Sequence, residues 1–260
     1  MNDVTLYQFE LCPYCHKVCA GLDLKGIAYR KVQVNPMSKK ELPALPASAP
    51  RKVPVLAIDG KLLWDSTDIL TYLDERFPAA TPFLPEDAAA RAKTVEIEAW
   101  VDDALTFALP TVIYGTWGEA VKAAQVTART SNFGFFQNAM VRAGGSLVMH
   151  EVSKRILKKR GQTDGRRWLS SELDKLEGWL GEQPFVCGET ISLGDVATHG
   201  ALTCINDFPA FAEMMQRPRV AAWYARVAAL RAERRAGATV TSSSSSAARG
   251  SSASPPASAP

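Results

Sequence analysis

Cys12-Pro13-Tyr14-Cys15 decides the fold of this chain, because it joins an expected strand to an expected helix. The apolar run Val4 to Phe9 comes directly before it, and a helix-patterned segment runs from Pro13 to about Leu24. A strand that turns tightly onto a helix N-terminus places Cys12 where unpaired backbone N–H groups and the positive end of the helix dipole favour a thiolate. Cys15 follows one turn later on the same face, so the pair can form a disulfide or share one thiolate. We therefore take Cys12 as a candidate nucleophile and Cys15 as its partner.

A lone Cys-x-x-Cys pattern leaves three interpretations open, namely a redox pair, half of a metal site, or chance. The three histidines are far apart and no two have the spacing of a metal pair, so we expect no metal site. His16 follows Cys15 and can assist a thiolate only if its side chain turns back, since adjacent residues of a helix point in different directions. The cysteines number five, an odd count that indicates a reducing compartment without structural disulfides.

The composition is that of an ordinary folded protein. Hydrophobic residues make up 47% of the 260 residues, which allows a sizeable core and one to two domains. A net charge of +3 is too small to imply nucleic acid as a partner. No apolar run approaches the roughly 18 residues of a membrane span, and a strand begins too soon after Met1 to leave room for a signal region. We therefore expect a cytoplasmic protein.

The first part of the chain predicts an α/β domain over residues 1–78. Strand-forming runs cover 4–9 and 27–34 on either side of the first helix. After a proline-rich loop, Asp59-Gly60 joins the runs 51–58 and 61–64, and Asp-Gly between such runs is a strong hairpin signal. An amphipathic helix then starts near Ser66 and ends before Pro78. This order of elements indicates a thioredoxin-like domain with a mixed four-stranded sheet.

The rest of the chain predicts helices. Residues 79–87 are rich in Pro and Ala and form an expected linker. An all-helical domain is expected over 88–235, with an aromatic, Gly-bearing connection through Tyr114 and Trp117. The tail 236–260 contains mainly Ser, Ala, Pro and Gly, so we expect it to be disordered. The expected helices cover 88–109, 137–160, 167–181, 192–208 and 218–235.

Motifs along both domains resemble the glutathione transferase superfamily and, within it, the membrane-associated prostaglandin E synthases of type 2. The similarity runs in order from residue 6 to residue 227. Its motifs in the first domain are Leu6-Tyr7-Gln8, Cys12-Pro13-Tyr14-Cys15, Val34-Asn35-Pro36, Arg51-Lys52-Val53-Pro54 and Asp65-Ser66. Those in the second domain are Phe133-Gly134, Ser153-Lys154-Arg155, Pro184-Phe185, Leu193-Gly194-Asp195-Val196-Ala197, Gly200 and Trp223-Tyr224-Ala225-Arg226-Val227. The resemblance implies a thioredoxin-like domain followed by an all-α domain, with a cleft between them.

The resemblance also implies a glutathione site. Val53 binds the cysteinyl backbone of glutathione by its main chain, next to a cis bond to Pro54. Asp65 and Ser66 hold the charged γ-glutamyl end. Tyr14 and Lys52 belong to the same set, with Lys52 reaching the glycyl carboxylate, and Cys12 then lies near the glutathione sulfur. Two simpler interpretations stay open: Pro54 is an ordinary trans edge proline, or Asp65-Ser66 is only a helix cap.

The function implied is a glutathione-dependent isomerisation of an endoperoxide to a keto-alcohol, with Cys12 and Cys15 as the catalytic pair. Haem as a further cofactor, a small apolar electrophile or peroxide as substrate, and a homodimer are also implied. One alternative is a thiol transferase or dehydroascorbate reductase that uses Cys12. Another is a non-enzymatic protein that binds glutathione and haem.

Two features qualify what the resemblance implies. The prostaglandin synthase pattern has a tyrosine three residues before the first cysteine, and this chain has Phe9, which donates no hydrogen bond to the thiol. The basic run Lys154-Arg155 with Lys158-Lys159-Arg160 fits either a solvated helix face or contact with an anionic membrane surface.

Overall fold

The computed structural model describes residues 4–78, 80–131, 133 and 144–247, with side chains up to Gly237. A four-stranded sheet forms the base of the first domain, in the order β2-β1-β3-β4. β1 pairs parallel with β2 and antiparallel with β3, which pairs antiparallel with β4. The predicted mixed sheet is confirmed. Its strands are Thr5–Gln8 (β1), Arg30–Gln33 (β2), Val55–Ile58 (β3) and Lys61–Leu63 (β4).

The hairpin between β3 and β4 follows from its two turn residues. Asp59 and Gly60 have φ of 52° and 74°, and a two-residue hairpin turn of this kind needs positive φ at both positions. Just before β3, the Val53-Pro54 bond is cis, as the resemblance implies. Because β3 begins at Val55, Val53 lies outside the sheet ladder.

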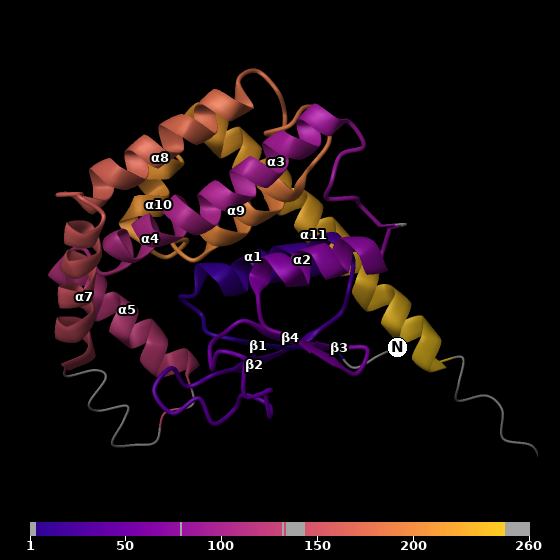
Figure 1. Cartoon of the computed structure of the whole chain (residues 1–260), viewed down its shortest axis with the longest axis horizontal. Helices are drawn as coiled ribbons and strands as arrows, with labels where there is room; N and C mark the ends of the chain where they lie inside the picture. Colours follow the sequence, from indigo (N-terminus) through magenta and orange to yellow (C-terminus); the bar gives the residue numbers. More distant parts are fainter. Residues whose placement is uncertain (1–3, 79, 132, 134–143, 248–260) are drawn as a thin grey trace, which may run out of the picture.

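Two helices cover one face of the sheet and separate it from the second domain (Figure 1). They are α1, Pro13–Leu24, and α2, Ser66–Arg76. Val18 and Leu22 of α1 and Ile69 of α2 pack with Leu6 and Leu56 of the sheet, and all five side chains are buried. This cluster fixes the start of α1, and with it Cys12, directly after β1.

The helical part differs from the prediction in two places. The expected helix over 88–109 is interrupted: α3, Ala88–Trp100, continues into a π-helical turn, η1, Val101–Leu105, and then into α4, Thr106–Ile113. The expected connection after Tyr114 contains the helix α5, Trp117–Thr130. Thr116 and Glu119 form a capping box at its start, which explains why a helix begins there despite Gly118.

The remaining helices agree more closely with the prediction, apart from the last. No strand follows β4 in the described part of the chain. The helix expected to end at Arg235 continues to Ala247, because a packed helix extends readily through Ala- and Ser-containing sequence once it is nucleated. The expected tail 236–260 is thus helical over its first twelve residues, and 248–260 lies outside the described residues. The first part of the helix expected over 137–160 also lies outside the described residues. These helices are α7 (Ser146–Lys159), α8 (Gly165–Leu180), α9 (Leu193–Thr203), α10 (Pro209–Met214) and α11 (Pro218–Ala247).

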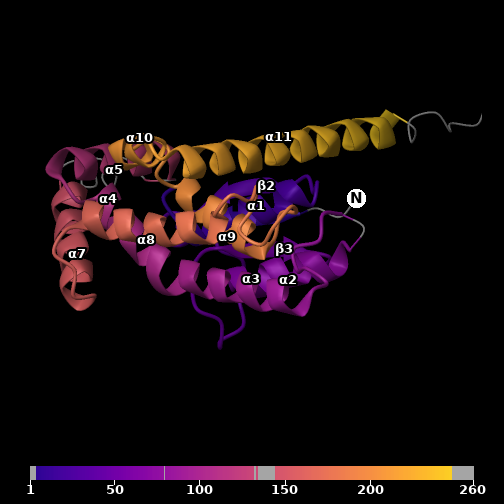
Figure 2. The ribbon, with the colours of Figure 1, turned by 90° about the horizontal axis from the view of Figure 1, so that it is seen from above.

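The two domains meet mainly where α9 crosses α1. A Cβ on Gly200 of α9 would lie 2.6 Å from the Cα of Lys17, so the two helices approach closely at this glycine. The long helix α11 runs from the helical domain along α1 and extends past the sheet (Figure 2). None of the described helices is long and apolar enough to cross a membrane.

Candidate active site between the two domains

Cys12 is the N-cap of α1 and is half-buried in the cleft. Its Sγ accepts a hydrogen bond from the backbone N–H of Cys15 at 3.4 Å. The pKa of the Cys12 thiol is lowered, chiefly by a hydrogen bond from the Cys15 side chain and further by backbone N–H groups of Cys15 and Tyr14, against the opposing effect of burial. Cys12 therefore has the properties expected of a nucleophilic thiolate.

Cys15 has the opposite properties. It is fully buried, and burial, followed by the neighbouring Cys12 sulfur, raises the pKa of its thiol well above the ordinary value. Of the two thiols, Cys12 therefore loses its proton more readily than Cys15. His16 does not serve the pair, because its Nε2 hydrogen-bonds the carbonyl of Glu10 at 2.7 Å and burial lowers its pKa.

The start of α2 offers a second set of polar groups. Asp65 is the N-cap, and its Oδ1 accepts from the N–H groups of Thr67 at 2.8 Å and Asp68 at 3.2 Å. The capping interpretation is therefore correct for Oδ1, while Oδ2 has no partner among the described residues and is exposed to solvent. Ser66 is buried, and its hydroxyl has no hydrogen bond to any described residue. Both groups are available to a ligand.

A cavity of about 230 Å³ lies beside the cis peptide bond. Lys52 and Val53 form one side of it, with the side chain of Lys52 exposed, and Pro54 behind them is buried. Phe9 and Pro36 form another side. This groove can take an extended peptide-like ligand along the free backbone of Val53.

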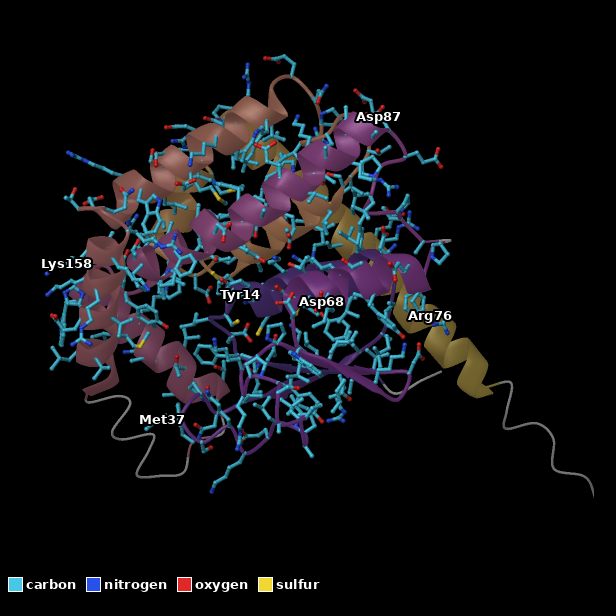
Figure 3. The ribbon with its side chains drawn as sticks, in the orientation of Figure 1. Tyr14, Met37, Asp68, Arg76, Asp87 and Lys158 are labelled. Carbon is cyan, nitrogen blue, oxygen red and sulfur yellow. The ribbon has the colours of Figure 1, made fainter. Side chains whose placement is uncertain are left out.

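Tyr14 faces the helical domain from the first turn of α1 (Figure 3). Its hydroxyl lies 3.0 Å from Oγ1 of Thr106, and burial raises its pKa. Tyr14 therefore joins the two domains through this hydrogen bond, and binding of glutathione by Tyr14 stays a prediction.

A buried ion cluster lies behind Tyr14. The Nζ of Lys17 donates to Glu98 at 2.7 Å and also to Asp102. Thr67 donates to the same Glu98 oxygen at 2.6 Å. Sequence reasoning missed this cluster, because nothing in the local pattern distinguishes Lys17 from an exposed helical lysine.

A second cavity of about 440 Å³ adjoins the first, since both are lined by Phe9 and Pro36. Met37, on the loop after β2, borders it next to α5 (Figure 3). Tyr114 is the residue that sequence reasoning placed only in a connection, and it lines this cavity opposite the first domain. The other described residues of the lining are Ala120, Ala124, Thr127, Phe133, Gly144, Gly145, Val148 and Met149, all of them uncharged. The cavity suits an apolar molecule.

The site as a whole brings together the residues predicted from the sequence. Cys12 lies next to a residue that both cavities share, because Phe9 lines each of them and its carbonyl accepts from the Cys12 N–H at 3.1 Å. Asp65 and Ser66 begin the helix that packs beside α1. A thiolate, a peptide groove and an apolar cavity therefore share one cleft.

Comparison with known proteins identifies the family of both domains. The model of the glutathione S-transferase N-terminal domain matches residues 6–82, and that of the C-terminal domain matches residues 147–231. Prostaglandin E synthase 2 of Danio rerio is 28% identical over 86% of this chain and 70% of its own length. The Mus musculus protein of the same name is also 28% identical, over 86% of this chain and 69% of its own length.

Solved structures agree on the fold. A glutathione S-transferase III in apo form matches with a TM-score of 0.62 and 18% identity, covering 98% of this chain and 100% of that one. The β-etherase LigF from Sphingobium sp. strain SYK-6 matches with a TM-score of 0.61 and 21% identity, covering 89% and 98%. The two domain models, matched in order on a thioredoxin-like and an all-helical domain, show that this chain belongs to the glutathione S-transferase family and is a glutathione-dependent enzyme.

Proposed function

We propose that the chain isomerises an apolar endoperoxide to a keto-alcohol, as the name of its prostaglandin E synthase 2 relatives suggests. The observation that carries this proposal is that Cys12, a thiol of lowered pKa, is hydrogen-bonded through its backbone N–H to Phe9, which lines an uncharged cavity of about 440 Å³. The substrate reacts there, and glutathione occupies the adjoining groove.

The described residues fit glutathione. Val53 presents free backbone groups for the cysteinyl part, and Lys52 offers a cation at the same groove for the glycyl carboxylate. Ser66 offers a free hydroxyl at the positive end of α2 for the γ-glutamyl carboxylate, and Asp65 offers Oδ2 for the ammonium group. Bound glutathione supplies a thiol that can return oxidised Cys12 to its reduced form.

The reaction balances without an external oxidant. The Cys12 thiolate attacks one endoperoxide oxygen, an S–O bond forms, and the O–O bond breaks. The second oxygen leaves as an alkoxide and takes up a proton to become the alcohol. A base then removes the proton from the carbon that carries the sulfur-bound oxygen, the carbonyl forms, and the S–O bond breaks to restore the thiolate.

The test is product formation from a prostaglandin endoperoxide in the presence of glutathione, measured against the spontaneous decay. We expect the wild-type protein and Cys187→Ser to form the keto-alcohol, and Cys12→Ser to fall to the spontaneous rate. Cys187 is a suitable control, because its half-buried thiol donates to the carbonyl of Ala90 in the helical domain. Wild-type activity in Cys12→Ser would refute the proposal.

The opposite pKa shifts of Cys12 and Cys15 favour a second candidate, thiol–disulfide exchange. A low-pKa thiol attacks a disulfide, and a neighbouring protonated thiol can then resolve the mixed disulfide. Turnover of hydroxyethyl disulfide with glutathione, lost in Cys12→Ser and altered in Cys15→Ser, would support this activity. Haem binding and a homodimer are proposed from the resemblance to the prostaglandin E synthases of type 2.

A further inference from the structure

Tyr114 is the C-cap of α4 and lies across the apolar cavity from the first domain. Only 7% of its surface is exposed, yet its side chain lines the same cavity as Phe9. Phe9 brings no polar atom to this cavity, so Tyr114 supplies a hydroxyl from the other domain.

The backbone of Tyr114 is held in place by α7. Its carbonyl accepts hydrogen bonds from Nδ1 of His150 at 2.9 Å and from Oγ of Ser153 at 3.2 Å. Its hydroxyl, in contrast, has no hydrogen-bond partner in the described part of the chain. A buried tyrosine hydroxyl usually has one, so this hydroxyl is free for a bound molecule.

The surroundings of Tyr114 keep its proton in place. Burial raises the pKa of Tyr114 first, and interaction with the sulfurs of Cys204 and Cys12 raises it further. Tyr114 is therefore neutral at neutral pH and close enough to Cys12 for the charge of the thiolate to act on its hydroxyl. The Tyr114 hydroxyl makes no hydrogen bond to Cys12 among the described residues, so the thiol does not occupy it.

We propose that Tyr114 donates a hydrogen bond, and then its proton, to the oxygen that leaves when the Cys12 sulfur attacks a peroxide or endoperoxide bond. This inference rests on the proposed function in taking Cys12 as the nucleophile. It assigns the donor that the departing alkoxide requires and makes Tyr114 a catalytic residue.

A simple hydroperoxide shows the balance of this step. The Cys12 thiolate forms an S–O bond to the terminal oxygen, the O–O bond breaks, and the sulfur is oxidised by two electrons as the peroxide is reduced. The alkoxide leaves with the electron pair of the O–O bond and takes the proton from Tyr114. The products are a sulfenic acid and an alcohol, and Tyr114 regains a proton from the sulfenic acid or from solvent.

The experiment mixes the reduced protein, without glutathione, with cumene hydroperoxide, which is apolar. Loss of the Cys12 thiol is followed by mass spectrometry. We expect Tyr114→Phe to slow this oxidation roughly 100-fold, at the lower end of what general acids contribute. Alkylation of Cys12 by iodoacetamide should be unchanged, because iodide leaves without a proton.

Tyr72→Phe is the matched control, since it removes a hydroxyl that is bonded to Asp59 at 3.2 Å, outside the cleft. It should leave both rates unchanged. Oxidation of Tyr114→Phe at the wild-type rate would overturn the proposal, and so would an equal loss in both reactions, which would mean that the hydroxyl acts on Cys12 itself.

A second measurement serves if Tyr114→Phe fails to fold. The wild-type protein is oxidised by a series of hydroperoxides whose leaving alcohols differ in acidity. A proton donor makes the rate depend only weakly on that acidity, so a steep dependence would contradict the assignment. Neither measurement uses the isomerase assay, so a failure to form keto-alcohol would refute the proposed function and leave the result on Tyr114 standing.

Discussion

Replacing Lys17 by Met should destabilise the protein strongly, because Lys17 is the only cation of the buried cluster described behind Tyr14. Its side chain is fully buried, and the side chains of Glu98 and Asp102 are 7% and 29% exposed. Met has a similar length and leaves no large cavity, so the change removes mainly the charge. Two carboxylates then remain at the domain interface without a counter-charge.

The expected loss follows from the burial of the cluster. Removing one partner of a buried ion pair costs about 3–5 kcal/mol in the free energy of unfolding. We expect the lower part of this range, since Asp102 is partly screened by solvent. For a chain of this size, a loss of about 3 kcal/mol corresponds to a fall in Tm of about 6–12 °C.

The matched control is Lys154→Met on α7. The Nζ of Lys154 lies 2.7 Å from the Glu151 carboxylate, the same distance that separates Lys17 from Glu98. The side chains of Lys154 and Glu151 are, however, both about half exposed. We expect no measurable loss there, because exposed pairs are screened by water. The comparison therefore isolates burial as the cause.

The assay is urea unfolding of the three proteins, followed by circular dichroism at several pH values. Burial raises the pKa of Asp102, so its charged form is disfavoured in the folded state, and the cost of that charge falls as the pH drops through the raised pKa. The deficit of Lys17→Met should therefore shrink as the pH is lowered from neutral. Equal stability of Lys17→Met and Lys154→Met, or a deficit that grows in acid, would refute the reasoning.

Three further predictions concern the cleft and the contact between α9 and α1. Cys15→Ala should raise the pKa of Cys12, because the hydrogen bond from the Cys15 side chain, the largest contribution that lowers this pKa, is lost. The pH at which alkylation of Cys12 reaches half its maximal rate measures the shift, and an unchanged pH profile would contradict the prediction. Asp65→Asn should keep the helix cap but weaken glutathione binding several-fold by calorimetry, since Asn caps as well as Asp but carries no charge. Gly200→Ala should cost about 1–3 kcal/mol in urea unfolding, because the added Cβ would meet the Lys17 backbone at 2.6 Å, whereas Gly178→Ala, with open space around it, should cost nothing.

Much of the fold could be predicted because its signals are local. Asp59-Gly60 specifies its hairpin by the backbone angles that the turn needs, and the helix expected from residue 192 begins with a capping box of Ser192 and Asp195. The helix α5 was missed although Thr116 and Glu119 carry the same kind of signal, because the neighbouring aromatic residues and Gly118 suggested a loop. The π-helical turn at Val101–Leu105 has no such local signature.

The residues of the candidate site likewise divide into those with a local sequence signal and those without one. Cys12, Cys15, Asp65 and Ser66 could be proposed from short motifs, because helix N-termini place them within a few residues of a recognisable signal. Tyr114 could not, since about a hundred positions of sequence separate it from Cys12 and only the packing of α4 against α1 brings the two residues to one cleft. Contacts between domains depend on the whole fold, and a single sequence does not show them.

The position of a tyrosine hydroxyl in the cleft decides to which atom it can donate a hydrogen bond. A tyrosine at position 9 would lie on the same domain as Cys12 and could hydrogen-bond the thiol itself. In this chain, Cys15 and the backbone N–H groups already lower the pKa of Cys12, so the thiolate needs no further donor there. Tyr114, on the opposite wall, can reach only what binds between the domains. With Phe9 and Tyr114 in these places, activation of the thiol and protonation of the leaving oxygen are assigned to different domains, so a substrate must bind between the domains before both can act on it.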